Sequence, residues 1–468
     1  MTTNTINSIA SSAYPAMNSG KNDHYSALKF ITCGSVDDGK STLIGRLLVD
    51  SKAVLQDHLA GVQRQGETDL ALLTDGLSAE REQGITIDVA YRYFATEERK
   101  FIIGDAPGHE QYTRNMVTAA SQADAAVVLV DATKLDWQNP QLQLLPQTRR
   151  HSLLVHLLRV HSLVFAVNKL DAVPDPQRAF AHIAAALARF AQDAGIQVAA
   201  TVPVSALKGW NVVDAQPGWC GYAGPSLLQI LELLPNTPAD TGLPLAFPVQ
   251  WVEKFSASSD TSQGRRVFWG RVAAGSVQPG MPVQIFPSGQ LAGVAQVLDH
   301  TRRPVDVDTG QSAGIVLDRE VDVSRGDWIV AAPVPGAPAD DDFDTPAAQP
   351  AWPGQREISA TVAWMDNEPL VAGRAYWALH GHRWVKAKVR RVVHRLDINT
   401  LAEEDASQLE PNAIGHIELL LQEPLPTAPF AQARVLGSLI LVDTASHATA
   451  GAVLVNTPNA PDAPVRAA

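Results

Sequence analysis

Residues 34 to 41 of this 468-residue chain read Gly34-Ser35-Val36-Asp37-Asp38-Gly39-Lys40-Ser41. The stretch matches the pattern G-x-x-x-x-G-K-[ST], which is typical of a phosphate-binding loop between a strand and a helix. The context agrees, because an apolar run at residues 28–32 precedes it and a helix-compatible segment at residues 41–49 follows it. Glycines let backbone N–H groups turn toward phosphates, Lys40 supplies a positive charge, and the Ser41 hydroxyl can ligate Mg²⁺. The sequence therefore predicts a nucleotide phosphate site at the start of the first helix.

A second motif, Asp105-Ala106-Pro107-Gly108-His109, follows the apolar run at residues 101–103. We expect Asp105 to hold Mg²⁺ through water, and Gly108 to let a backbone amide approach the γ-phosphate. His109 is the candidate for positioning the attacking water, although a lone turn histidine is more often simply exposed. Upstream, Thr86 offers a second hydroxyl ligand for Mg²⁺ on a loop that can close over the nucleotide.

A third motif, Asn168-Lys169-Leu170-Asp171, follows the apolar run at residues 163–167. The Asp171 carboxylate can accept hydrogen bonds from N1–H and the exocyclic amine of guanine, a donor pair that adenine lacks. The segment Ser205-Ala206-Leu207-Lys208 would complete the base pocket. The order of these motifs predicts a GTP-hydrolysing switch that uses Mg²⁺. The residues expected to contact nucleotide are Gly34, Ser35, Val36, Asp37, Asp38, Gly39, Lys40, Ser41, Thr42, Asp105, Ala106, Pro107, Gly108, His109, Asn168, Lys169, Asp171, Ser205, Ala206 and Leu207, with Ser41, Thr86 and Asp105 as metal ligands and His109 and Thr86 as catalytic residues.

Composition limits the alternatives. The 37 Lys and Arg residues against 49 Asp and Glu give a net charge of −12, which disfavours a nucleic-acid-binding surface. The hydrophobic fraction of 46% excludes wholesale disorder. Two cysteines are too few for a disulfide framework, so a reducing, cytoplasmic location is expected. No apolar run reaches the ~20 residues that cross a bilayer, and no membrane association is expected.

The pattern along the chain predicts three folded domains between two tails. Apolar runs alternate with helical segments over residues 28–236, which predicts an α/β P-loop GTPase domain with a doubly wound, mostly parallel sheet. Short strands split by Gly and Pro then predict two small antiparallel β-barrel domains, at residues 245–332 and 356–456. Residues 333–355 are rich in Pro, Ala and Asp and are interpreted as a linker. Residues 1–27 and 457–468 are interpreted as flexible tails.

Several stretches carry a family resemblance. Gly84-Ile85-Thr86-Ile87 and the Asp-x-Pro-Gly-His motif resemble the translation-factor branch of GTPases. A narrower likeness is to the GTP-binding large subunit of bacterial two-subunit sulfate adenylyltransferase. It is carried by residues 35–48, 75–77, 79–94, 108–116, 147–151, 363–365 and 437–443.

The resemblance implies a hetero-oligomer with a small catalytic subunit of the ATP-pyrophosphatase type. Adenylyl sulfate and pyrophosphate would form there from ATP and sulfate, and GTP hydrolysis on the present chain would drive that reaction. Ala106 stands where the family has Thr. Residues 134–146 replace a shorter connection and are interpreted as a surface insertion, which could contact a partner or nothing. Some family members carry a fused C-terminal kinase, but the G-x-x-x-x-G-K-[ST] pattern occurs here only at Gly34, so no such kinase is expected.

Two other functions are also compatible with the sequence. One is a translation-type GTPase acting with tRNA or the ribosome, since fold alone does not assign function. The other is a nucleotide-dependent scaffold without productive hydrolysis. The basic stretch of Arg390, Arg391, His394 and Arg395 is predicted to be the solvent face of a strand rather than an RNA-binding patch.

Overall fold

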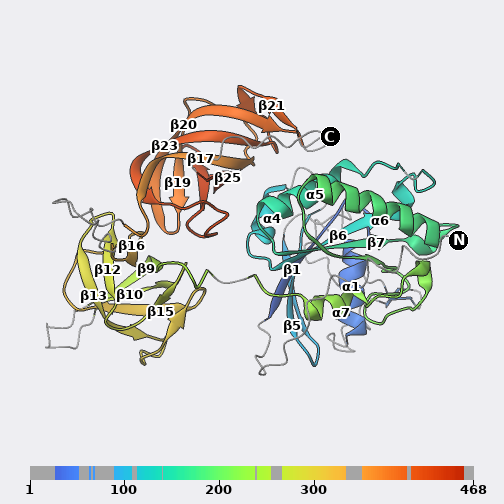
Figure 1. Cartoon of the computed structure of the whole chain (residues 1–468), viewed down its shortest axis with the longest axis horizontal. Helices are drawn as coiled ribbons and strands as arrows, with labels where there is room; N and C mark the ends of the chain where they lie inside the picture. The colour runs from blue at the N-terminus through green and yellow to red at the C-terminus, as the bar shows by residue number, and fades with distance from the viewer. Residues whose placement is uncertain are drawn as a thin grey trace, which may run out of the picture. The chain divides into compact units, whose positions relative to one another are not determined.

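The computed structural model describes residues 27–51, 63–64, 67–68, 89–107, 113–139, 141–237, 240–254, 266–333, 350–397 and 402–457. The chain divides into two compact units, with the main boundary between Pro238 and Ala239. Figure 1 shows helices and a sheet in the first unit and strands in the second.

The first unit contains a six-stranded sheet in the order β4-β5-β1-β6-β7-β8. Neighbouring strands run parallel except β4, which is antiparallel to β5. The predicted mostly parallel α/β sheet is thus confirmed. Its strands are β1 (Leu28–Cys33), β4 (Ala90–Ala95), β5 (Lys100–Asp105), β6 (Ala125–Asp131), β7 (Ser162–Asn168) and β8 (Val198–Pro203), and a separate short pair is formed by β2 (Gln63–Arg64) and β3 (Glu67–Thr68).

Helices cover both faces of this sheet, which is why β6 and β7 are buried along their whole length. On one face α1 (Lys40–Asp50) and α7 (Leu227–Leu233) pack with Phe30, Phe101 and Ile103 in a single apolar core. On the other lie α4 (Thr113–Ala120), α5 (Pro146–Leu157) and α6 (Pro176–Asp193) (Figure 1). Short 3₁₀ turns η3 (Ala132–Lys134), η4 (Leu170–Ala172) and η5 (Trp219–Gly221) complete the unit.

Local sequence signals explain where these helices begin. The Asp175 carboxylate accepts a hydrogen bond from the Arg178 backbone N–H at 3.2 Å, and Pro176 occupies the first turn of α6. Ser226 and Gln229 form a reciprocal capping box at the start of α7.

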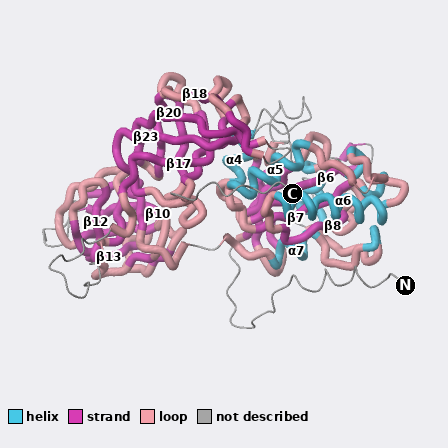
Figure 2. Tube along the Cα trace, turned by 45° about the horizontal axis from the view of Figure 1, so that its top comes forward, coloured by secondary structure: helices cyan, strands magenta, loops and turns pink. Residues whose placement is uncertain are grey.

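The second unit contains two antiparallel barrels, in which strands dominate (Figure 2). The first closes in the order β10-β15-β13-β12-β16-β9. Its strands are β9 (Ala246–Lys254), β10 (Arg266–Arg271), β12 (Pro282–Phe286), β13 (Leu291–Leu298), β15 (Ser312–Leu317) and β16 (Trp328–Ala331), beside the small pair β11 (Ser276–Val277) and β14 (Val307–Asp308).

The other barrel is a seven-stranded sheet in the order β19-β24-β25-β17-β23-β20-β21, closed by pairing of β19 with β20. Its strands are β17 (Gly354–Trp364), β19 (Ala375–His380), β20 (Arg383–Leu396), β21 (Glu403–Asp405), β23 (Ile414–Pro426), β24 (Ser438–Asp443) and β25 (Thr449–Val455), with the short pair β18 (Leu370–Val371) and β22 (Gln408–Leu409). In both barrels the inward side chains alternate with outward ones, as the sequence pattern predicts.

A small apolar core joins the two barrels. The Trp328 ring stacks on the His380 ring with centroids 4.8 Å apart, and Arg383 pairs with Asp327 at 2.9 Å. Trp352 is buried in the same core and its indole N–H donates to the Leu245 carbonyl at 3.0 Å. Trp352 belongs to the segment at residues 333–355 that is interpreted from sequence as a linker. The structure differs from that interpretation at this end of the segment, because one large apolar side chain is enough to anchor it.

The described ranges contain no helix whose length and hydropathy together would suit a membrane span.

Candidate nucleotide-binding site

The loop between β1 and α1 has the backbone that the motif predicts. Gly34, Asp37 and Gly39 have φ angles of 152°, 63° and 92°. A Cβ atom at Gly39 would lie 2.6 Å from the side-chain nitrogen of Asn168. Only glycine fits there, because both the positive φ and this close approach exclude a side chain.

Lys40 is buried at the first position of α1, and the loop wraps around its amine. The ammonium group donates to the carbonyl oxygens of Ser35 at 2.8 Å and Gly34 at 3.2 Å. Burial lowers the pKa of the Lys40 amine, while the charges of Asp105 and Asp38 act in the opposite direction. The structure thus holds a buried cation inside the loop, at the carboxyl edge of the sheet.

Asp105 ends β5, directly beside β1. Its carboxylate accepts a hydrogen bond from the Thr32 hydroxyl at 3.2 Å, and the next residue, Ala106, donates its backbone N–H to the Thr32 carbonyl at 3.1 Å. Asp105, Ala106 and Pro107 are buried. The half-buried Ser41 hydroxyl, in the first turn of α1, and the Asp105 carboxylate are the oxygen ligands that Mg²⁺ prefers.

Asn168 joins the phosphate loop to the segment Ser205-Ala206-Leu207, which is predicted to line the base pocket. This buried side chain lies at the end of β7, where its amide donates to the Asp38 carbonyl at 2.8 Å. Its oxygen accepts the Ala206 backbone N–H at 3.0 Å. One side chain therefore fixes the loop against the segment Ser205-Ala206-Leu207, whose Ser205 is buried and whose Leu207 is 65% exposed.

Asp171 lies half-buried in η4, two residues beyond Lys169, which has a left-handed φ of 62°. Near it, Cys220 is a buried free thiol. Burial, and to a lesser extent the Asp171 charge, raise the pKa of this thiol to about 12. The carboxylate that is predicted to read guanine is thus placed at the sheet edge that also carries the phosphate loop.

Three residues that the motifs do not include also hold the site together. Arg46 of α1 donates to the carbonyl oxygens of Ala206 and Leu207. Asp131 ends β6 and pairs with Lys169 at 2.8 Å, and Lys134 of η3 pairs with Asp38 at 2.9 Å. For Asp131 a signal existed in the sequence, since it ends an apolar strand just as Asp105 and Asn168 do. For Arg46 and Lys134 none existed, because their partners are 160 and 96 residues away.

Burial raises the pKa of Asp131, but hydrogen bonds from Lys169 and Thr133 outweigh this effect and the net shift is downward. Asp131 is therefore held as a buried carboxylate ion, available to anchor lysine side chains.

Thr86, Gly108 and His109 lie outside the described residues, so their predicted roles stay predictions. The structure does bring together the other three elements: the loop from Gly34 to Thr42, Asp105 with its neighbours, and the segments that follow β7 and β8.

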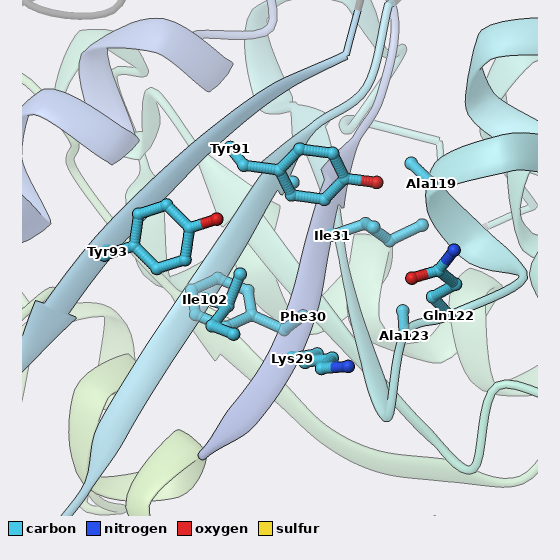
Figure 3. Close-up of a pocket in the computed structure, with 10 residues that line it drawn as sticks. Lys29, Phe30, Ile31, Tyr91, Tyr93, Ile102, Ala119, Gln122 and Ala123 are labelled. Atoms are coloured by element: carbon cyan, nitrogen blue, oxygen red, sulfur yellow. The ribbon is translucent and has the colours of Figure 1, made fainter. Parts of the chain in front are cut away.

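Two other surface features contain none of the predicted nucleotide contacts. In the basic stretch on β20 the His394 side chain is only 15% exposed, but the three arginines are exposed and paired. Arg390 is bound to Glu357 at 3.1 Å and Arg391 to Glu418 at 2.7 Å. This confirms its interpretation as a solvent face. A groove of about 300 Å³ lies over β1, β4 and β5, where Figure 3 shows Tyr91 and Tyr93 beside Ile31 and Ile102.

The parallel α/β sheet and the family models matched below place the first unit among the GTP-binding domains of the translation-factor GTPase superfamily. Residues 26–237 match the family described as "Elongation factor Tu GTP binding domain", and residues 357–456 match "GTP-eEF1A C-terminal domain-like". A solved structure of sup35 complexed with GDP is 21% identical, with a TM-score of 0.39 over 94% of this chain and 97% of that one, too weak a likeness to carry weight.

Curated relatives narrow the class. "Sulfate adenylyltransferase subunit 1" of Laribacter hongkongensis is 42% identical over 92% of this chain and 85% of its own length. The protein of that name from Salmonella typhi is 41% identical over 92% of this chain and 86% of its own. The chain belongs to the sulfate adenylyltransferase subunit 1 family.

"Bifunctional enzyme CysN/CysC" of Xylella fastidiosa is 46% identical over 91% of this chain. The present chain spans 65% of the length of that relative.

Proposed function

We propose that this chain binds GTP with Mg²⁺ and hydrolyses it as the large subunit of a sulfate adenylyltransferase. Hydrolysis drives formation of adenylyl sulfate and pyrophosphate from ATP and sulfate on a separate small catalytic subunit. The observation that carries the proposal is the Asn168 side chain, which joins the phosphate loop to the base-side segment in one buried arrangement. Family membership supports the same assignment.

Each part of the site has a task in this proposal. Lys40 and the backbone N–H groups of its loop bind the phosphates, and Asp171 selects guanine. Ser41 and Asp105 fit Mg²⁺ by the chemistry of their oxygens, and Thr86 is the third expected ligand. When bound, Mg²⁺ neutralises charge on the phosphates. His109 positions the attacking water.

The energetic logic supports a coupled switch. A sulfate–phosphate anhydride is unfavourable to form from ATP and sulfate, so hydrolysis tied to the partner's cycle can pull the reaction forward. Such coupling requires contacts that differ between the GTP and GDP states. We assign those contacts to the loops that contain Thr86 and His109.

The relatives named subunit 1 support a hetero-oligomer, and we propose an adenylyltransferase of the ATP-pyrophosphatase type as the other subunit. Cys33 and Cys220 are both buried free thiols, which fits a reducing, cytoplasmic compartment. The relatives do not favour the translation-type alternative.

The test is the rate of GTP hydrolysis by the full chain with the small subunit from the same source, ATP and sulfate. We expect faster hydrolysis when all three are present than when sulfate or the small subunit is left out. Equal rates in every mixture would contradict the coupling. Acceleration by ribosomes or tRNA instead would support a translation GTPase.

A further inference from the structure

The segment at residues 134–146, interpreted from sequence as a surface insertion, is partly buried. Leu135, Leu142 and Leu144 are each at most 6% exposed. Its first residue, Lys134, lies at the end of η3, immediately beyond β6, and reaches back to the phosphate loop. This lysine has no place in the motifs that define the site.

We propose that Lys134 is a positioning residue for the phosphate loop, which it holds in its nucleotide-binding form by neutralising Asp38. The proposal rests on the proposed function insofar as the ligand is a guanine nucleotide. Lys134 acts on the affinity for nucleotide phosphates through the loop, without itself touching the reacting atoms.

Lys134 contacts the phosphate loop at both a side chain and a backbone carbonyl. The Lys134 ammonium donates to Asp38 Oδ1 at 2.9 Å and also to the Val36 carbonyl. The other carboxylate oxygen of Asp38 accepts the Ser35 backbone N–H at 2.6 Å. Asp38 thus holds the loop through a hydrogen bond within it, and Lys134 holds Asp38 from the end of η3.

Charge makes the lysine necessary. The Asp38 side chain is fully buried, in a loop that has to receive a polyanion. A buried carboxylate without a cationic partner is costly, and it would also repel phosphates. Among the described residues Lys134 is the one ion-pair partner of Asp38 within 4 Å. Because Lys134 takes the Asp38 charge, the Lys40 ammonium stays directed at the loop carbonyls, close to where phosphates are expected.

Lys169 makes contacts with the phosphate loop that can be compared with those of Lys134. Lys169 donates to the Asp37 carbonyl and pairs with Asp131 at 2.8 Å, while Lys134 lies 4.0 Å from the same Asp131 carboxylate. Lys134 therefore connects the Val36 carbonyl to the buried Asp131 carboxylate, and Lys169 connects the next carbonyl, of Asp37, to the same carboxylate. Only Lys134 also pairs with a carboxylate inside the loop, so its loss leaves an uncompensated charge.

The experiment measures dissociation constants for GTP and GDP by calorimetry on the full chain. Lys134→Met keeps the aliphatic stem and removes the charge. We expect both nucleotides to bind at least about tenfold more weakly, because the unpaired Asp38 carboxylate repels phosphates and the loop loses the hydrogen bonds that Lys134 donates. Adding Asp38→Asn to this variant removes the stranded charge, and we expect affinity to return to within about threefold of wild type.

The controls separate this effect from a structural one. Lys100→Ala removes an exposed lysine at the opposite end of β5 from Asp105, and it should change neither constant. Lys134→Arg should retain most of the affinity. The nucleotide-free melting temperature of Lys134→Met should fall, because the unpaired Asp38 charge destabilises the fold, and adding Asp38→Asn should raise it again. The titrations are therefore run at a temperature at which every variant is fully folded.

Wild-type affinity in Lys134→Met, or failure of Asp38→Asn to restore binding, would overturn the assignment of Lys134. Failure of the wild-type chain itself to bind GTP would instead overturn the proposed function, so the two failures are distinguishable.

Discussion

Lys40 places a buried positive charge inside a backbone loop, and its pKa is lowered by that burial. The two carbonyls that now accept its hydrogen bonds are neutral, so a phosphate oxygen is a stronger partner for the same ammonium group. We expect Lys40→Ala to weaken GTP binding by about 100-fold, the equivalent of ~2.7 kcal/mol. Unchanged affinity in equilibrium titration would rule out the phosphate-loop assignment.

We propose that Asp171 selects the base. Exchanging its carboxylate for an amide replaces one acceptor by a donor, which suits the additional carbonyl of xanthine better than the amine of guanine. Asp171→Asn should therefore bind xanthosine triphosphate more tightly than GTP, measured by competition between the two nucleotides. Retained preference for GTP would mean that the base pocket lies elsewhere.

Much of this site is predictable from sequence, because its residues follow apolar strands that end at one sheet edge. Gly34, Asp105 and Asn168 are found this way. Other contacts are not predictable. Lys134 and Arg46 look like ordinary surface cations in the sequence, and their roles depend on partners brought close only by the fold.

At the scale of the elements, the small core between the barrels contains a buried histidine. His380 ends β19, stacks on Trp328, and donates its Nε2–H to the Leu436 carbonyl at 3.1 Å. Burial lowers the pKa of His380 to about 4, although the hydrogen bond to Leu436 acts in the opposite direction. The imidazole is therefore neutral in the folded barrels at pH 7.

The sign of the pH dependence follows from proton binding. Between pH about 6.5 and about 4 the unfolded chain protonates this histidine and the folded chain does not. The free energy of unfolding should fall as pH falls through that window, by ~1.4 kcal/mol per pH unit for one group.

His380→Gln retains a donor for Leu436 and does not titrate. The calorimetric transition of the barrel unit should therefore lose less stability between pH 7 and pH 5 in this variant than in wild type. An equal loss of stability in the two proteins would show that His380 does not contribute to the pH dependence of unfolding. His151, His156 and His382, whose pKa values burial also lowers, titrate in both proteins and cancel in the comparison.

The same core shows that the sequence pattern of a strand does not predict which side chains of other strands it contacts. Alternating residues predict that β16 and β19 are barrel strands, but not that Trp328 of one stacks on His380 of the other. Trp352 illustrates the same limit, since Pro and Ala around it suggest a linker while its indole is buried between the barrels. Composition averages over a segment, and a single aromatic side chain can decide where that segment packs.

At the scale of the whole molecule, one domain carries the nucleotide site and two barrels follow it. The acidic net charge of −12 disfavours RNA binding, and the glutamates that pair with Arg390, Arg391 and Arg395 reduce the positive charge that β20 could offer to RNA. The relatives named subunit 1 support a protein partner instead, and we propose that GTP hydrolysis supplies the free energy for the reaction on that partner.

The most direct test is adenylyl sulfate formation from ATP and sulfate by this chain mixed with the small subunit, with and without GTP. We predict GTP-stimulated product that disappears when either chain is omitted. At GTP concentrations that saturate only the wild-type chain, stimulation should be lost with Lys40→Ala, which should bind GTP about 100-fold more weakly. It should also be lost with His109→Ala, which should bind GTP but hydrolyse it slowly. Absence of stimulation from a wild-type chain that binds GTP would contradict the coupling of GTP hydrolysis to adenylyl sulfate formation.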